Sequence, residues 1–142
     1  MKMNQLQKSG EPFNVYIPVE NKEGATLNRG EVVEWDTTNT IGFSVEEVDS
    51  AGPQHVAGVV EDTTIADNAV GMIQIHGLHD AVLTSTTLTP GLACSADTES
   101  GVGKLVDHSA ATDVAANAAG AIVGACLEVV DTNSAKVMLR LM

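Results

Sequence analysis

Candidate metal ligands gather at one place in the sequence, His76-Gly77-Leu78-His79-Asp80, where two imidazoles stand three positions apart and a carboxylate follows the second. A structural zinc site typically takes four ligands, and a catalytic one typically takes three from the protein. No second pair of cysteines or histidines stands at a spacing that would complete such a set. We therefore expect no metal site, and we expect these histidines to flank a surface turn after a strand that ends near Gly77.

A cysteine nucleophile is the second chemistry to consider. Cys126 could pair with His55, His79 or His108 if the fold brought them together, but both Cys94 and Cys126 lie in apolar runs. Neither has a neighbouring base or helix N-terminus that would lower its pKa and favour the thiolate. The sequence therefore predicts two small buried hydrophobic residues without a disulfide, no catalytic residue, and a protein that is not an enzyme.

The acidic and glycine-rich loops do not favour a bound cofactor. Segments 62–68 and 97–101 carry several oxygen ligands, but neither has the spacing of a calcium loop. The glycines of segment 101–103 do not precede a helix with a basic residue that could cradle a phosphate. Trp35 is the only tryptophan, and in a chain so poor in aromatic residues it is expected to anchor the core.

Length and charge narrow the classes of function. The chain has 142 residues, which suits one domain, with seven basic and nineteen acidic side chains and a formal net charge of −12. This charge repels the phosphate backbone, so binding to nucleic acid is not expected. No run approaches the roughly 18 apolar residues of a membrane span, and residues 1–8 lack a hydrophobic signal core, so we expect neither membrane insertion nor secretion.

The elements around these residues are expected to be strands. Short runs of Val, Ile and Thr separated by turn residues indicate an all-β sandwich or barrel. The Ala-rich stretch 109–120 interrupts the pattern and predicts a short helix or a loop. Residues 1–12 are expected to form a flexible N-terminal arm, and residues 13–142 a single β-barrel domain. The expected strands are 13–18, 31–36, 55–61, 71–76, 80–84, 92–96, 104–107, 121–130 and 135–141.

The chain also contains an internal repeat, approximately residues 27–77 and 88–142. In this alignment Cys94 and Cys126 take the strand positions of Val33 and Val60. Two similar β units pack most readily by sharing a sheet or closing one barrel, which leaves few exposed edges. We therefore expect a compact β-barrel built from two similar units. The aligned segments are 27–36 with 88–97, 56–62 with 122–128, and 72–76 with 136–140, which places Gly30 on Gly91 and Gly58 on Gly124.

Several short motifs suggest a family. They are Gly-Glu-Val-Val at 30–33, Ala-Gly-Val at 57–59, an alternating strand closed by a glycine at 70–77, Thr-Pro-Gly at 89–91, and Ile-Val-Gly-Ala followed by an alternating strand over 122–141. With these motifs the chain, from about Gly24 onward, resembles the small decoration, or cement, proteins of tailed-bacteriophage capsids. The Ala-rich stretch has no counterpart in the pattern of that family.

The resemblance implies a β-tulip-like barrel that binds the outer capsid surface of the virion as a homotrimer and stabilises the lattice of the major capsid protein. It implies that the arm binds the shell, commonly by adding a strand to a capsid sheet. That arm comprises Met1, Lys2, Met3, Asn4, Gln5, Leu6, Gln7, Lys8 and Phe13. The expected partners are the major capsid protein and further copies of this chain, with no nucleic acid, membrane or cofactor.

Three other functions remain open. A tail- or fibre-associated virion barrel would share this composition and strand content. A carbohydrate-binding module would need exposed aromatic rings, for which Trp35 and Tyr16 are the main candidates. An enzyme would require His76, His79 or a cysteine to act on a substrate.

Overall fold

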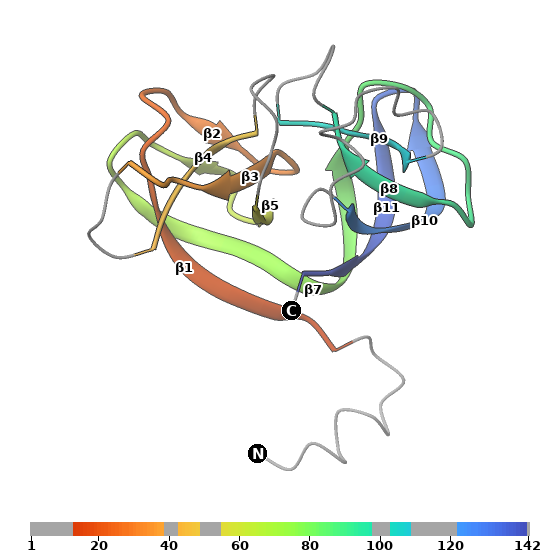
Figure 1. Cartoon of the computed structure of the whole chain (residues 1–142), viewed down its shortest axis with the longest axis horizontal. Coiled ribbons are helices and arrows are strands. Elements are labelled where there is room, and N and C mark those ends of the chain that lie inside the picture. Colours follow the sequence, from red (N-terminus) through yellow and green to blue (C-terminus); the bar gives the residue numbers. More distant parts are fainter. Residues whose placement is uncertain (1–12, 39–42, 49–54, 98–102, 109–121, 142) are drawn as a thin grey trace.

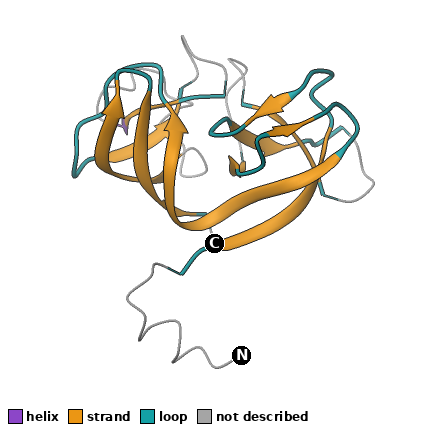
Figure 2. Ribbon diagram, turned by 180° about the vertical axis from the view of Figure 1, so that it is seen from behind, coloured by secondary structure: helices purple, strands orange, loops and turns teal. Residues whose placement is uncertain are grey.

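The structure, a computed structural model of the chain, describes residues 13–38, 43–48, 55–97, 103–108 and 122–141. These residues form strands and loops without an α-helix, which confirms the predicted all-β fold (Figure 2). The strands are β1 (Val15–Asn21), β2 (Leu27–Asn28), β3 (Val32–Trp35), β4 (Ser44–Glu47), β5 (Val56–Val60), β6 (Thr64–Ile65), β7 (Val70–Leu83), β8 (Ala93–Ala96), β9 (Leu105–Asp107), β10 (Ile122–Asp131) and β11 (Ser134–Arg140).

Five strands close into a barrel, the first unit, in the order β1, β4, β3, β5, β7 and back to β1. β1 pairs parallel with β4 and antiparallel with β7, which closes the ring. Because alternate residues of a strand point to opposite faces, one face of each strand lines the interior. The side chains that fill it are aliphatic, namely Val19, Leu27, Val33, Val45, Ala57, Val60, Ile65 and Ile73.

β7 joins this barrel to the rest of the molecule and runs along both halves (Figure 1). Our prediction of two strands, 71–76 and 80–84, with a surface turn between them is wrong. At Gly77 the backbone takes a φ of 96°, and a Cβ there would lie 2.7 Å from the carbonyl oxygen of Phe13. A glycine in this conformation bends a strand without ending it. The strand therefore continues, and residues 77–83 belong to a second unit.

The second unit has the same topology as the first. Residues 77–83 of β7 are followed in the sheet by β11, β10, β8 and β9. A parallel bridge between Thr84 and Leu105 joins the two ends, as the parallel pairing of β1 with β4 does in the first unit. In both units the first strand is also antiparallel to the last: β1 to β7 in the first unit, and residues 77–83 of β7 to β11 in the second. The described residues thus form two similar β units that share one long strand.

Equivalent turns in the two units have equivalent backbone hydrogen bonds. The amide of Gly30 donates to the carbonyl of Val60 at 2.9 Å, and the amide of Gly91 donates to Cys126 at 2.8 Å. The reciprocal bonds also recur: the amide of Val60 donates to the carbonyl of Glu31, and the amide of Cys126 donates to the carbonyl of Leu92. The two glycines have φ angles of 91° and 90°, a region that other residues rarely adopt. The sequence alignment of the halves therefore pairs residues with the same local geometry.

The units differ where the first inserts a turn into the second. In the first unit the amide of Glu20 donates directly to the carbonyl of Phe43. The corresponding amide in the second unit, that of Leu83, donates instead to segment 30–32 of the first unit, at 2.9 Å. Gly103, which corresponds to Phe43, accepts a bond of 2.8 Å from the same segment. Segment 30–32 therefore lies between two strands of the second unit and forms part of its wall.

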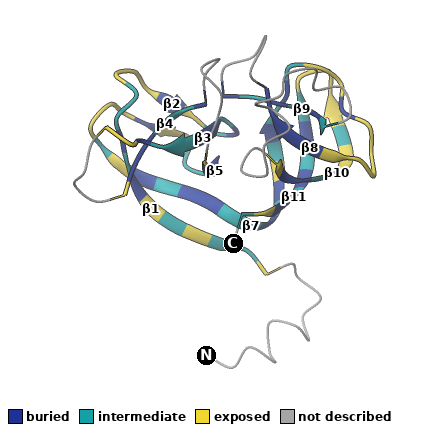
Figure 3. Ribbon diagram, viewed as in Figure 1, coloured by how far each residue is buried: buried dark blue, intermediate teal, exposed yellow. Residues whose placement is uncertain are grey.

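A second core lies in and beside this unit, and both halves of the chain contribute to it (Figure 3). β5 is buried along its whole length, because its residues face the first core on one side and the second core on the other. Cys94 and Cys126 are free and fully buried here, as predicted. The members of this core are Val32, Val48, Val56, Val59, Val82, Leu88, Cys94, Ala96, Leu105, Val123, Cys126, Ala135, Val137 and Leu139.

Three short strands, β2, β4 and β6, were not predicted from the sequence. β4 has the sequence Ser-Val-Glu-Glu, in which a single apolar residue gives no recognisable alternation. The pair β2 and β6 is only two residues long on each side. The predicted arm, residues 1–12, and the Ala-rich stretch 109–120 lie outside the described residues.

Candidate functional site

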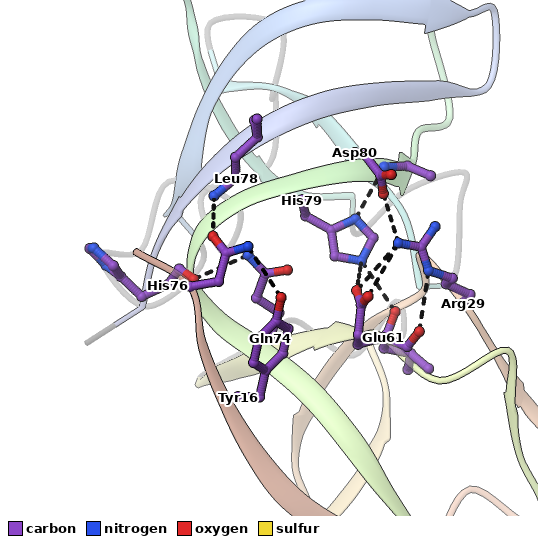
Figure 4. A network of polar contacts seen from close by, with 11 residues as sticks. Tyr16, Arg29, Glu61, Gln74, His76, Leu78, His79 and Asp80 are labelled. Carbon is purple, nitrogen blue, oxygen red and sulfur yellow. Dashed lines mark hydrogen bonds and ion pairs between the residues drawn. The ribbon is translucent and has the colours of Figure 1, made fainter. Parts of the chain in front are cut away.

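The main cluster of charged side chains in the described part of the chain lies where the two units meet (Figure 4). Arg29 follows β2, and Glu61 follows β5, so both belong to the first unit. His79 and Asp80 lie on the part of β7 that belongs to the second unit. We call these four residues the seam network, because they connect the two units through side chains.

Arg29 is the centre of the seam network. Its Nη2 donates to Asp80 Oδ1 at 2.7 Å and lies 3.3 Å from Glu61 Oε1, and its Nε donates to the Glu61 carbonyl at 3.2 Å. The hydrogen bond from Arg29 holds the pKa of Asp80 below its usual value. The Asp80 side chain is 63% exposed, so solvent screens this pair and weakens it. Arg29 therefore connects a turn of the first unit to a strand of the second.

His79 is the buried member of the seam network, which corrects our expectation of a surface turn. Its Nδ1 accepts a hydrogen bond of 3.2 Å from the amide of Ala81, so the proton of the neutral ring lies on Nε2. Nε2 lies 3.3 Å from the carbonyl oxygen of Val60 and 3.2 Å from Glu61 Oε2. Burial lowers the pKa of His79, and Glu61 opposes that shift. His79 is thus a neutral imidazole that donates to the first unit.

A hollow of about 270 Å³ opens beside the seam network. The amide Nε2 of Gln74 donates to the His76 carbonyl at 3.1 Å, and Asn14 Oδ1 accepts from the Leu78 amide at 3.1 Å. These polar groups therefore bind other parts of the protein. The side chains known to line the hollow include no serine, cysteine or lysine. They belong to Asn14, Tyr16, Arg29, Glu61, Gln74, Leu78 and Asp80.

The two histidines of the 76–80 segment do not face one another. His76 is half-buried, whereas His79 points toward Glu61 (Figure 4). Among the residues that the structure describes, no group of three or more His, Cys, Asp or Glu side chains could hold a metal ion. The acidic loop residue Asp62 accepts a hydrogen bond from the Met72 amide at 3.0 Å. Asp62 therefore contributes to holding β7 in place.

The cysteines occupy apolar surroundings. Burial raises the pKa of the Cys94 thiol to about 12, and it raises that of Cys126 as well. Both residues are therefore protonated at neutral pH, and a protonated thiol is a weak nucleophile. Their positions match those of Val33 and Val60 in the first unit, where the same sites hold aliphatic side chains.

Of the residues assigned to a capsid-binding arm, only Phe13 lies within the described residues. It is 43% exposed and precedes β1, where its carbonyl lies beside Gly77 at the bend of β7. Met1, Lys2, Met3, Asn4, Gln5, Leu6, Gln7 and Lys8 lie outside them. Trp35 packs against the first core and against Phe43, with ring centroids 5.7 Å apart, as expected for a packing anchor.

Sequence reasoning missed Arg29 and Glu61. Their signal is a difference between the aligned halves, because Pro90 stands at the position of Arg29 and Leu127 at that of Glu61. A charged pair in one half and an apolar pair in the other indicates that the two surfaces have different surroundings.

No family model matches the chain, and no curated protein or solved structure matches it. Within the described residues, no helix has the length and apolar character needed to cross a membrane.

Proposed function

We propose that this protein is a structural component of a phage virion that binds the outer capsid surface as a trimer and stabilises the lattice of the major capsid protein. One observation carries the proposal. Large apolar side chains are exposed at separate places on both units, while the polar groups of the seam network bind one another. We take these side chains to form the contact surfaces, because contiguous exposed apolar patches, unlike single exposed residues, mark interaction surfaces. They are Phe13, Tyr16, Phe43, Val70, Leu92, Ile122, Leu127 and Val130.

The two-unit architecture suits such a role. A closed barrel leaves few unpaired edge strands, so it does not aggregate by pairing strands with other chains. A cement protein gains affinity from many modest contacts, and joining several copies multiplies them through effective concentration. The exposed side chains supply such contacts without a dedicated pocket.

Residues 1–12 and Phe13 are the proposed shell-binding arm. Lys2 and Lys8 provide positive charge on a chain whose net charge is −12, so they favour approach to an acidic shell. Phe13 follows this segment, and its carbonyl lies beside Gly77 at the bend of β7, the strand that both units share. An extended arm can add backbone hydrogen bonds along a sheet edge of the capsid protein.

The test is co-sedimentation with phage capsid shells that were assembled from a major capsid protein in the absence of this chain. We expect the intact chain to sediment with the shells, and we expect deletion of residues 1–12 together with Phe13→Ala to reduce binding at least tenfold. Thr132→Ala, at an exposed polar position in the turn between β10 and β11 and outside the set of exposed apolar side chains, is the control. An intact chain that stays in the supernatant would refute the proposed function. An arm deletion that binds as tightly as the intact chain would refute the role of the arm.

A further inference from the structure

The contact between the two units covers a defined surface of the first unit, around the turn at Gly30. Gly30 is buried, and a Cβ there would overlap the carbonyl oxygen of Ala81 and lie 3.3 Å from the Leu83 side chain. Glu61, beside this turn, faces His79. Val56, on the neighbouring strand, is 7% exposed because it packs into the second core. The second unit therefore covers this turn and the strand next to it.

The corresponding surface of the second unit is uncovered. Gly91 has the same φ as Gly30, but no atom lies within 4 Å of a Cβ built there. Leu92 is 40% exposed, Leu127 is 50% exposed at the position of Glu61, and Ile122 is 39% exposed at the position of Val56. Leu127 lies close to Leu92, since the amide of the residue before it, Cys126, donates to the Leu92 carbonyl. We call Pro90, Gly91, Leu92, Ile122 and Leu127 the Gly91 surface.

The elements that cover the Gly30 turn also have uncovered counterparts. By strand pairing, Ala81 and Leu83 of the second unit correspond to Pro18 and Glu20 of β1, and Gly103 corresponds to Phe43. Pro18 is exposed, and Phe43 is 67% exposed.

Val70 extends this surface. It pairs with Glu20 across the sheet and is 72% exposed. Phe43 lies on the other side of Glu20 and accepts a hydrogen bond from its amide. We call Pro18, Glu20, Phe43 and Val70 the β1 surface.

We propose that the Gly91 surface of one copy binds the β1 surface of a second copy, in a contact that follows the internal contact between the units. Each chain thus carries the uncovered equivalents of both sides of an interface that it forms only once within itself. The substitution pattern favours another copy as the occupant. Where the internal contact uses Arg29 and Glu61, the Gly91 surface has Pro90 and Leu127. Chains of net charge −12 repel one another, so a contact between copies requires locally neutral, apolar surfaces such as these.

The two surfaces differ, so the contact is heterologous, and it generates a closed ring or an open chain of subunits. At the β1 surface the amide of Glu20 already donates to Phe43. A second copy would therefore pack on the apolar side chains around this bond, without inserting its turn between the strands. This inference names the contact between copies that the proposed trimer also requires, so in this respect it rests on the proposed function. Binding to the capsid shell is tested separately by co-sedimentation.

The first experiment compares molar masses in solution by light scattering over a range of protein concentrations. We expect the intact chain to exceed the 14.7 kDa of one copy, and we expect Leu127→Glu and Val70→Arg each to reduce the mass to that of one copy. Val130→Glu is the matched control. Val130 is as exposed as Leu127 and lies outside the aligned segments that define the Gly91 surface.

A mixing experiment tests whether the contact is heterologous. Leu127→Glu leaves the β1 surface intact, and Val70→Arg leaves the Gly91 surface intact, so an equimolar mixture should form complexes of two chains and nothing larger. Formation of this complex also shows that both variants are folded. Three outcomes would overturn the inference: an intact chain of one-copy mass throughout, variants that associate as the intact chain does, or a mixture that stays at one-copy mass. In each case the occupant of the Gly91 surface would be another segment of the same chain or a different protein.

Discussion

Gly30 and Gly91 offer a matched pair of substitutions, because they share a backbone conformation and differ in their surroundings. An alanine at φ near 90° costs about 1–2 kcal/mol in the left-handed region. Gly91→Ala should destabilise the fold by that amount alone, since its Cβ would meet no atom within 4 Å. Gly30→Ala adds a clash with the Ala81 carbonyl, which costs roughly 1–3 kcal/mol as overpacking.

The clash at Gly30 also endangers a hydrogen bond. The Leu83 amide donates to the Gly30 carbonyl, a bond worth about 1 kcal/mol. We therefore expect Gly30→Ala to lower the free energy of unfolding by roughly 3–6 kcal/mol, clearly more than Gly91→Ala. The assay is urea denaturation at dilutions where the protein has the mass of one chain. Gly24→Ala, at another positive φ with no atom within 4 Å, serves as a second reference. Equal losses at Gly30 and Gly91 would refute the close contact between the units.

Two predictions concern pH. Burial holds the pKa of His79 below its ordinary value of 6.5, so the unfolded chain binds a proton more readily than the folded chain. The free energy of unfolding should therefore fall as pH drops below about 6.5, by at most about 1.4 kcal/mol per pH unit. His79→Gln retains a donor and an acceptor and should flatten this slope in urea titrations; an unchanged slope would mean that His79 does not titrate on unfolding. Burial raises the pKa of Glu47, and the charges of Glu31 and Glu23 raise it further. The ionised Glu47 carboxylate therefore destabilises the fold at neutral pH. This destabilisation disappears as pH falls through the raised pKa and the carboxylate becomes protonated. Glu47→Gln should stabilise the protein at pH 7 by a few tenths to about 1 kcal/mol and not at pH 4, as measured by thermal unfolding; a loss at pH 7 would contradict the sign.

The sequence predicted the fold class because its signals are local. Turn residues and short aliphatic runs indicated the strands, and the Gly30 and Gly91 motifs aligned the halves with the correct equivalence of turns. The break placed at Gly77 was wrong, because a glycine at a strand bend and a glycine in a turn look the same in sequence. What distinguishes them here is the backbone of Phe13 and Asn14, which lies more than 60 positions away in the chain. β4 escaped notice because its burial comes from its neighbours β1 and β3, and its own composition is polar.

The candidate site shows the same division between local and distant signals. The 76–80 segment was noticed for its ligand types, yet the partners that determine the state of His79 are Val60, Glu61 and Ala81, and two of these come from another unit. Arg29 and Glu61 could have been found by comparing the halves position by position, since each is aligned with an apolar residue, Pro90 or Leu127, in the other half. That comparison identifies where the environments differ, but only the structure shows that the charged pair lies at the internal contact and the apolar pair at the surface.

The placement of charge at the internal contact has a consequence for assembly. A chain made of two similar units could pair its own halves or pair with another copy, and the two contacts would compete if they had the same chemistry. The internal contact requires Asp80 and His79 opposite Arg29 and Glu61, and a second copy that presented Pro18 there would leave these polar groups without partners. Arg29 and Glu61 are about one-third exposed, so losing these partners costs less than the roughly 1–3 kcal/mol of a fully buried unpaired group, but it still disfavours the wrong pairing. Conversely, the apolar Gly91 surface gains nothing from the charged residues of the seam network. The division of polar and apolar residues between two equivalent positions therefore directs each surface to a different partner, and it does so by penalising the wrong pairing as well as favouring the right one.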